Sequence, residues 1–145
     1  MGVIYLSLDM ALQVYTKTIV HSGGGLTGIR DQGQLECILE MVQNDDYYPT
    51  FLEKLVYLIY STNRSHCFLD GNKRISITLG AQFLLLNGYM AFAKRFFNEM
   101  ENISYHLASG RISRELLMKI VQSIMDGEGD FSEELKFEIL LAISD

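Results

Sequence analysis

Two segments of the chain, 55–60 and 75–86, are apolar almost all the way round a helix, and a short polar stretch, 65–74, separates them. A helix that is hydrophobic on every side has to be buried on several sides. The rest of the chain must therefore fold around this pair. Apolar residues recur elsewhere at helical rather than alternating spacing, and Pro49 is the single proline. The sequence thus predicts an all-α fold.

Capping residues and glycines predict about six to seven helices around this central buried helix pair. Ser7 and Asp31 are the expected N-caps of the first two helices, and Ser113 is that of the sixth. The glycines at 23–25 lack the Lys-Ser/Thr of a phosphate-binding P-loop, so we interpret them as a helix end and loop. The expected helices span about 8–21, 32–43, 50–64, 71–87, 97–109, 113–125 and 132–143.

The length of 145 residues, with 48% hydrophobic content, predicts one compact domain with a buried core. Residues 1–126 form the expected functional domain, and 127–145 form an acidic C-terminal helical extension. This extension holds 6 acidic and 1 basic side chains, against 12 and 11 in the body. A nearly neutral body argues against nucleic-acid binding, which needs clustered basic residues.

The expected cellular compartment depends on the cysteines and on two patterns that the sequence does not contain. Cys37 and Cys67 show neither metal-ligand nor disulfide spacing, so we expect reduced thiols. The sequence contains no secretory signal pattern and no apolar run near 18 residues. We therefore expect no membrane interaction and a cytoplasmic protein.

The polar stretch between the two buried helices holds the residues suited to chemistry. Gly71 and Asn72 tolerate the tight backbone that exposes successive N–H groups at the start of a helix. Such a helix N-terminus attracts anions, and Lys73 and Arg74 add two cations beside it. We therefore expect a phosphate group to bind at this point.

Two further residues precede this helix start. Asp70 is placed to hold Mg²⁺ against a di- or triphosphate, and it is equally placed to cap the helix. Histidine titrates near neutral pH, which suits His66 to accept a proton from an attacking hydroxyl. Phe68 is expected to anchor the loop in the core.

Each of these residues also has a simpler reading: a hydrogen-bonded structural histidine, a capping aspartate, or a solvated Lys-Arg pair. Their convergence within nine residues favours a site instead. A metal centre built on His66 is not favoured, because no second His or Cys lies at ligand spacing.

The run from His66 to Arg74, His-Cys-Phe-Leu-Asp-Gly-Asn-Lys-Arg, resembles the Fic/Doc signature His-x-Phe-x-Asp/Glu-Gly-Asn-Gly/Lys-Arg. Residues 24–31 and the helix after them are similar to the death-on-curing (Doc) branch, and the similarity extends over about 5–126. The resemblance implies an all-helical Fic fold that uses ATP and Mg²⁺. It also implies the roles of the signature residues: a general base at His66, a metal ligand at Asp70, and phosphate contacts from Asn72, Arg74 and the loop amides.

Two positions distinguish the branches of this family. Adenylylating members usually carry Gly before the Arg and a second Arg three residues after it, whereas this chain has Lys73 and Ile77. Lys at the first position resembles the Doc branch, which is associated with ATP-dependent phosphorylation of a Ser or Thr on a translation factor. We therefore favour a protein kinase, with an elongation factor as a possible target class. A Fic-type adenylyltransferase and a non-catalytic, partner-binding relic are the alternatives.

On this interpretation Lys73 and Arg74 stabilise the transferred phosphate, and Asn72 and the Gly71 amide hold neighbouring oxygens. Arg64 would orient the target or the phosphate. Thr78, a polar exception one turn after Arg74, is a further candidate for the nucleotide site, and a hydroxyl bonded back to a helix carbonyl is its equal alternative.

Regulation is expected to come from a partner. The sequence lacks the Ser/Thr-x-x-x-Glu-Gly/Asn run of self-inhibited Fic enzymes, so the resemblance implies a toxin restrained by a small antitoxin that supplies a helix to an apolar groove. The loop 47–49 corresponds to the family's target-holding flap, or it simply packs. The tail helix, with Leu135, Ile139 and Ile143 on one face, is expected either to pack on the body or to cover the basic phosphate site.

Overall fold

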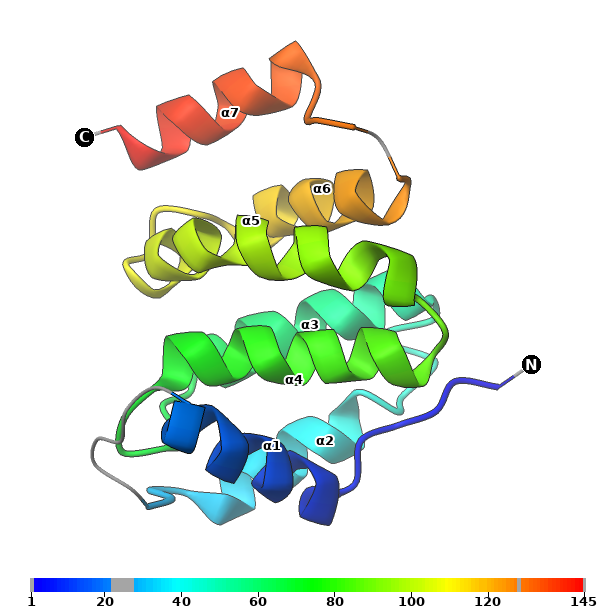
Figure 1. Cartoon of the computed structure of the whole chain (residues 1–145), viewed down its shortest axis with the longest axis vertical. Coiled ribbons are helices and arrows are strands. Elements are labelled where there is room, and N and C mark those ends of the chain that lie inside the picture. Colours follow the sequence, from blue (N-terminus) through cyan, green and yellow to red (C-terminus); the bar gives the residue numbers. More distant parts are fainter. Residues whose placement is uncertain (1, 22–27, 128, 145) are drawn as a thin grey trace.

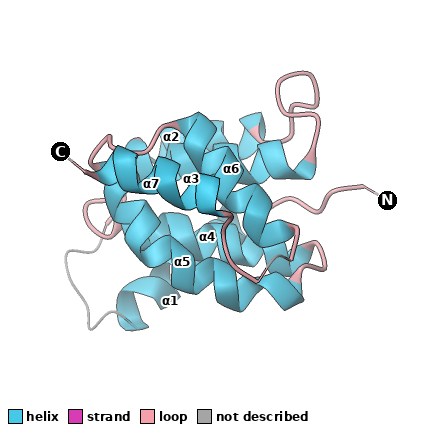
Figure 2. Cartoon of the chain, turned by 90° about the horizontal axis from the view of Figure 1, so that it is seen from above, coloured by secondary structure: helices cyan, strands magenta, loops and turns pink. Residues whose placement is uncertain are grey.

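The computed structural model describes residues 2–21, 28–127 and 129–144. They form seven helices: α1 (Leu8–His21), α2 (Gln32–Met41), α3 (Phe51–Arg64), α4 (Asn72–Leu86), α5 (Met90–Ala108), α6 (Arg114–Met125) and α7 (Glu133–Ile143). These residues contain no strand, only an isolated bridge between Ile29 and Phe68 (Figure 2). The all-α prediction is confirmed. The glycine run 23–25 lies outside the described residues.

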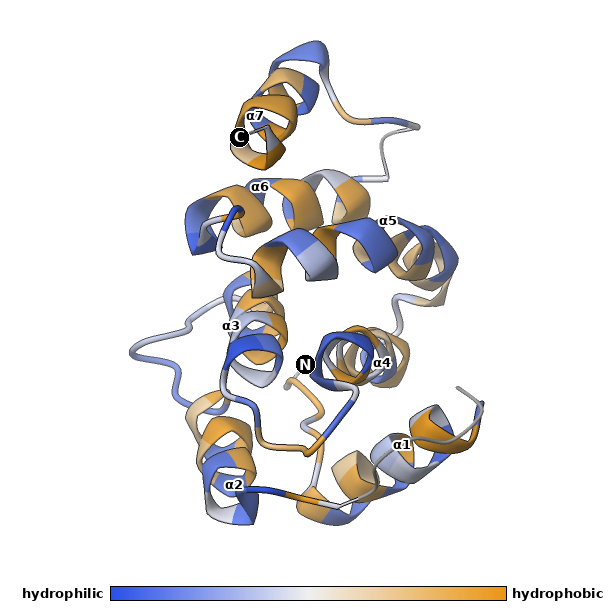
Figure 3. Ribbon diagram, turned by 90° about the vertical axis from the view of Figure 1, so that its left-hand side faces the viewer, coloured by the Kyte–Doolittle hydropathy of each residue, from blue (hydrophilic) through white to orange (hydrophobic). Residues whose placement is uncertain are grey.

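The helices stack in layers with α3 and α4 at the centre (Figure 1). Helices α1 and α2 lie on one side of this pair, α5 and α6 lie on the other, and α7 follows beyond α6. The pair is buried as predicted: other helices lie on several sides of it, and orange, apolar stretches run along α3, α4 and the helices around them (Figure 3). Its most buried apolar residues are Leu55, Val56, Leu58, Ile59, Ile75, Ile77, Leu79, Phe83 and Leu84.

Most helices begin where the sequence predicts. Asp31, Thr50, Ser113 and Ser132 each accept a hydrogen bond from the backbone N–H three residues later, as N-caps do. Ser7 accepts in the same way at the start of α1. Short polar side chains therefore mark these starts in the sequence.

The predicted start of the fifth helix, at about residue 97, is wrong. Helix α5 begins at Met90, directly after the turn in which Gly88 takes a φ of 87°. Its N-cap position is Tyr89, which makes no capping bond through its side chain. Without a capping residue, the seven residues before Phe97 gave no signal of a helix start.

The tail helix packs onto the body, as one of the two readings expected. Helix α7 lies against α6, where Leu135 is buried and Ile139 and Ile143 are partly buried. Lys119 of α6 and Glu138 of α7 form an exposed ion pair at 3.0 Å. Among the described helices, none is both long enough and apolar enough to cross a membrane.

Gly80 of α4 lies where side chains of α3 and α5 leave no room for a side chain. A Cβ at this position would lie 2.9 Å from the Phe96 ring and 3.1 Å from Ile59. The packing of α4 against α3 and α5 therefore requires glycine here.

We expect Gly80→Ala to lower the free energy of unfolding by about 1 kcal/mol or more. Alanine in a helix normally stabilises by about 0.5–1 kcal/mol over glycine, but overpacking a core costs about 1–3 kcal/mol. Urea denaturation followed by circular dichroism measures the change. Gly129→Ala is the control, because a Cβ there meets nothing within 4 Å. Equal stability of the two variants would contradict the close packing of α4.

Candidate active site

The loop between α3 and α4, residues 65–71, which we call the motif loop, is paired with a second segment, 28–31. The backbone N–H groups of Arg30 and Asp31 donate to the Cys67 carbonyl at 2.7 and 3.0 Å. In return, the Leu69 N–H donates to the Gly28 carbonyl at 3.1 Å. Sequence reasoning did not identify segment 28–31 as part of the site, because a pairing of two short loops leaves no periodic pattern in the sequence.

Phe68 anchors the motif loop in the core, as predicted. Its side chain is fully buried, and its ring stacks on Tyr15 with the centroids 4.6 Å apart. The Asn72 side chain binds both backbone groups of Phe68: Oδ1 accepts from the N–H at 3.1 Å, and Nδ2 donates to the carbonyl at 2.9 Å. Asn72 therefore holds the loop in place, besides any contact it makes with a ligand.

Cys67 of the motif is a buried, free thiol. Burial raises the pKa of this thiol, and its contact with the Ser65 hydroxyl at 3.1 Å only partly opposes that shift. The thiol therefore stays protonated at neutral pH and is unsuited to act as a nucleophile. The second thiol, Cys37, is also free and is exposed.

Two positive φ angles shape the backbone on either side of Phe68. His66 has a φ of 53° and is the only non-glycine residue with a positive φ in the described part of the chain. Gly71, with a φ of 79°, takes the same left-handed region at the start of α4. A left-handed conformation costs a non-glycine residue about 1–2 kcal/mol. Such strain is typical of functional positions that the surrounding structure holds in place.

The start of α4 leaves backbone donors open. Its first backbone bond runs from the Ile75 N–H to the Gly71 carbonyl at 2.8 Å, and no side chain caps the helix. The N–H groups of residues 72–74 thus have no acceptor among the residues described. Asp70 is not the predicted cap of the helix: its Oδ1 accepts from the Gly71 N–H at 2.8 Å. Its other oxygen makes no hydrogen bond with a described residue.

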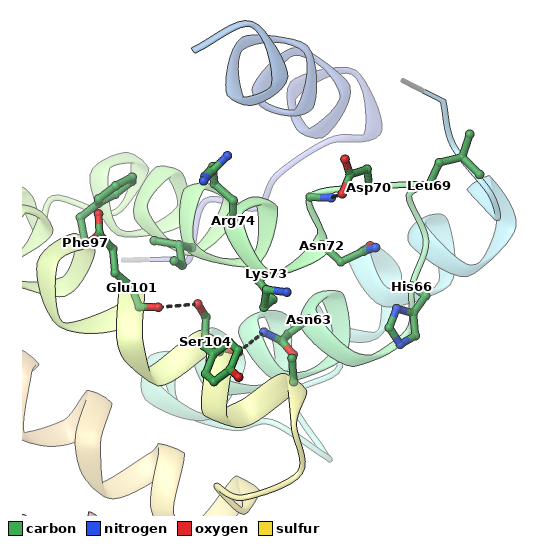
Figure 4. A pocket seen from close by; sticks show the side chains of 14 residues that line it. Asn63, His66, Leu69, Asp70, Asn72, Lys73, Arg74, Phe97, Glu101 and Ser104 are labelled. Atoms are coloured by element: carbon green, nitrogen blue, oxygen red, sulfur yellow. Dashed lines mark hydrogen bonds between the residues drawn. The ribbon is translucent and has the colours of Figure 1, made fainter. Parts of the chain in front are cut away.

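Three polar or charged side chains of the motif are exposed and make no hydrogen bond or ion pair with the described residues: those of His66, Lys73 and Arg74. They line the same cavity as Asp70 and Asn72 (Figure 4). The fixed partial charges of an open helix N-terminus add to the two cations. The combination suits a phosphate group.

The cavity has a volume of about 550 Å³, within the range of small-molecule sites. The motif loop and α4 form one wall, with His66, Leu69, Asp70, Gly71, Asn72, Lys73, Arg74 and Ile77. Asn63 of α3 also lines it, and α5 forms the opposite wall with Phe97, Glu101, Ser104, Tyr105 and Ala108. Sequence reasoning missed the α5 wall, since these residues look like the surface of any amphipathic helix.

Arg64 and Thr78 do not reach this cavity. Arg64 Nη1 donates to the Leu107 carbonyl at 3.0 Å, so its side chain ties α3 to the end of α5. Thr78 Oγ1 bonds back to the Ile75 carbonyl at 3.2 Å and lies 2.9 Å from Thr18 Oγ1 of α1. For Thr78, the structure thus favours the hydroxyl bonded back to a helix carbonyl. The Arg64 side chain is directed to α5 and does not line the cavity of the signature residues.

The loop 47–49 is not the flap of this site, so that prediction is wrong. It precedes α3, whereas the motif loop follows α3 at the opposite end of the helix. Tyr48 packs on Tyr57 with ring centroids 4.3 Å apart, and Arg114 donates to its hydroxyl at 3.2 Å. The segment that pairs with the motif loop is 28–31.

The prediction that the acidic tail helix covers the phosphate site is also wrong. No described residue of 129–144 lines the cavity. Helix α7 lies beyond α6, on the far side of α5 from α4 (Figure 1). Its apolar residues pack on α6, which sets its position away from the motif loop.

Comparison with known proteins agrees with the signature. A model of the Fic/DOC family matches residues 5–84, which include the whole motif loop and most of α4. "Protein kinase doc" of Escherichia phage P1 is 33% identical over 94 residues, which cover 62% of this chain and 71% of that protein. "Toxin Doc" of Mycolicibacterium smegmatis is 30% identical over 90 residues, which cover 59% of this chain and 69% of that protein.

We expect Asn72→Ala to lower the free energy of unfolding by about 1–3 kcal/mol, because it removes both bonds to the Phe68 backbone. Lys73→Ala should change it by less than about 0.5 kcal/mol, because that side chain is exposed and unpaired within the described structure. Urea denaturation of the two variants, neighbours in the sequence, makes the comparison. Unchanged stability of Asn72→Ala would contradict its role in holding the loop.

Proposed function

Because the chain belongs to the Fic/DOC family, we propose that it transfers a phosphoryl group from ATP to a Ser or Thr hydroxyl of a target protein. A translation elongation factor is the target class that the family resemblance implies. We assign the transferase to residues 1–126 and treat 127–145 as an extension outside it. The coarser class, a protein-modifying transferase that uses a nucleotide, follows from the family itself.

One observation carries the proposal: a single cavity collects open backbone donors, two cations and a histidine, and these side chains have no partner among the described residues. Phosphoryl transfer depends mainly on positioning and on neutralising charge, and little on covalent chemistry by the protein. Lys73, Arg74 and the amides at the start of α4 supply that neutralisation. The side chains have no competing partner in the described structure, so they are available to a phosphate.

The donor set fits a magnesium ion bound together with phosphate. Among the described residues, no group of three or more His, Cys, Asp and Glu side chains gathers, so a magnesium ion bound there would need ligands from the phosphates. Asp70 would hold Mg²⁺ through its remaining oxygen, with phosphate oxygens as further ligands. When bound, the ion would neutralise charge on the phosphates.

His66 is assigned the proton transfer. Its imidazole would accept the proton of the target hydroxyl as that oxygen attacks the phosphorus. The left-handed backbone at His66 and the buried Phe68 two residues later fix the position of the backbone that carries the His66 imidazole. Fixed placement of a base favours proton transfer over random encounter.

Ile77 supports phosphoryl over adenylyl transfer. It is 4% exposed and lines the cavity one turn after Lys73. An isoleucine offers no donor to a phosphate, so the second cationic contact expected of an adenylylating enzyme is missing at this position. Similarity to a protein called a protein kinase points the same way.

We expect γ-labelled ATP, but not α-labelled ATP, to label a protein in a bacterial lysate treated with this chain. His66→Ala should lower the labelling rate by about 10²- to 10⁴-fold, because it removes the general base. Arg74→Ala should also lower it, whereas Lys94→Ala, an exposed cation on α5 outside the cavity, should not. Transfer of the α-label would establish the adenylyltransferase instead, and transfer of neither label would favour the non-catalytic relic.

We also propose that a small antitoxin restrains the enzyme. Beside the cavity lined by the signature residues, which we call the active cavity, lies a second cavity of about 700 Å³ between α1 and α4. Arg74 and Phe97 line both cavities. Val14, Ala81 and Leu85 give the second cavity apolar surface, and Lys17 and His21 also line it. An amphipathic helix with acidic residues fits this combination, and helix-in-groove binding is a common mode of recognition.

We expect expression of the chain alone to stop bacterial growth, because an unrestrained transferase would modify its target. Expression of His66→Ala should leave growth unchanged at the same protein level. Culture density after induction, with the protein level checked by immunoblot, measures both. Normal growth with the active chain would contradict the toxin assignment.

A further inference from the structure

The active cavity has two chemically different walls. The motif loop and α4 supply positive charge and N–H donors, whereas the α5 wall carries one carboxylate, Glu101, and no cation. A carboxylate repels phosphate at short range. The phosphates therefore belong at the α4 wall, and the α5 wall faces the part of the ligand that is not phosphate.

Asn63 adds a deeper acceptor. The side chain is 1% exposed, and Nδ2 donates to the Ser104 carbonyl at 3.1 Å. Because only the amide nitrogen can donate to a carbonyl, this bond fixes the orientation of the side chain. Oδ1 has no partner within the described structure. A buried acceptor left unpaired costs about 1–3 kcal/mol, so a donor that reaches it is stabilising.

Glu101 is the acceptor at the rim. Its carboxylate is exposed and makes no ion pair with a described residue, although Lys73 and Arg74 line the same cavity. The neighbouring Ser104 hydroxyl donates to the backbone carbonyl of Glu101 at 3.2 Å. This wall therefore presents acceptor oxygens to the cavity (Figure 4).

Two aromatic side chains flank Glu101 on the same face of α5. Phe97 lies four residues before it and Tyr105 four residues after it, a spacing that aligns side chains on a helix. Phe97 is 37% exposed and Tyr105 is 53% exposed, so both rings are open to a ligand. Stacking of a nucleobase on an aromatic ring contributes about 1–3 kcal/mol.

We propose that the α5 wall is the nucleoside subsite of this cavity. Glu101 and, more deeply, Asn63 accept hydrogen bonds from the hydroxyl or amine donors of the nucleoside, and Tyr105 or Phe97 packs on its base. The inference rests on the proposed function and names the residues that recognise the end of the nucleotide remote from the transferred phosphate.

The test compares ATP with inorganic tripolyphosphate, which carries the phosphates without the nucleoside. Isothermal titration calorimetry with Mg²⁺ present measures both affinities. The protein should bind ATP at least 10-fold more tightly than tripolyphosphate. Tyr105→Ala and Glu101→Ala should each weaken ATP binding by about 5- to 100-fold and leave tripolyphosphate binding unchanged or slightly tighter. The exposed pair is chosen because substituting Asn63 would also remove its bond to Ser104.

Asn102→Ala, an exposed change on α5 outside the cavity, is the matched control and should leave both affinities unchanged. Equal affinity of the unchanged protein for the two ligands would overturn the nucleoside subsite and leave the phosphate site standing. Tighter ATP binding that neither α5 variant weakens would overturn its placement on α5. Failure of both ligands to bind would overturn the proposed function, and the subsite with it.

Discussion

The anchoring of the motif loop is the constraint on which the rest of the site depends. Phe68 is buried against Tyr15, and the Asn72 side chain binds its backbone on both sides. Segment 28–31 pairs with the loop from outside. These contacts fix the point at which α4 begins. No side chain among the described residues caps α4, so its first amides stay open at the cavity that the signature residues line.

The signature therefore divides into residues that build the loop and residues that face the cavity. Phe68, Gly71 and Asn72 shape the backbone, through burial, a left-handed φ and two hydrogen bonds. His66 and Arg74 have no partner in the part of the chain that is described. A single short run thus supplies both the rigid support and the reactive groups.

The central helix pair and the signature were predictable from the sequence, because both are local. The apolar residues on all sides of α3 and α4 indicate burial without further information. Thr50 and Ser113 indicate helix starts because their hydroxyls can cap a helix. Features that depend on tertiary packing were not predictable. Arg64 bonds to α5 instead of facing the cavity, and Glu101 reaches the cavity only because α5 packs beside α4. No pattern within either segment carries that information.

On the proposed function, the start of α4 holds the phosphates of a nucleotide. A crystal structure with a non-hydrolysable ATP analogue and Mn²⁺ tests it most directly, since Mn²⁺ gives an anomalous signal. We expect phosphate oxygens within hydrogen-bonding distance of the N–H groups of residues 72–74, and an anomalous peak beside Asp70. A nucleotide bound elsewhere, or one whose phosphates point away from α4, would contradict it.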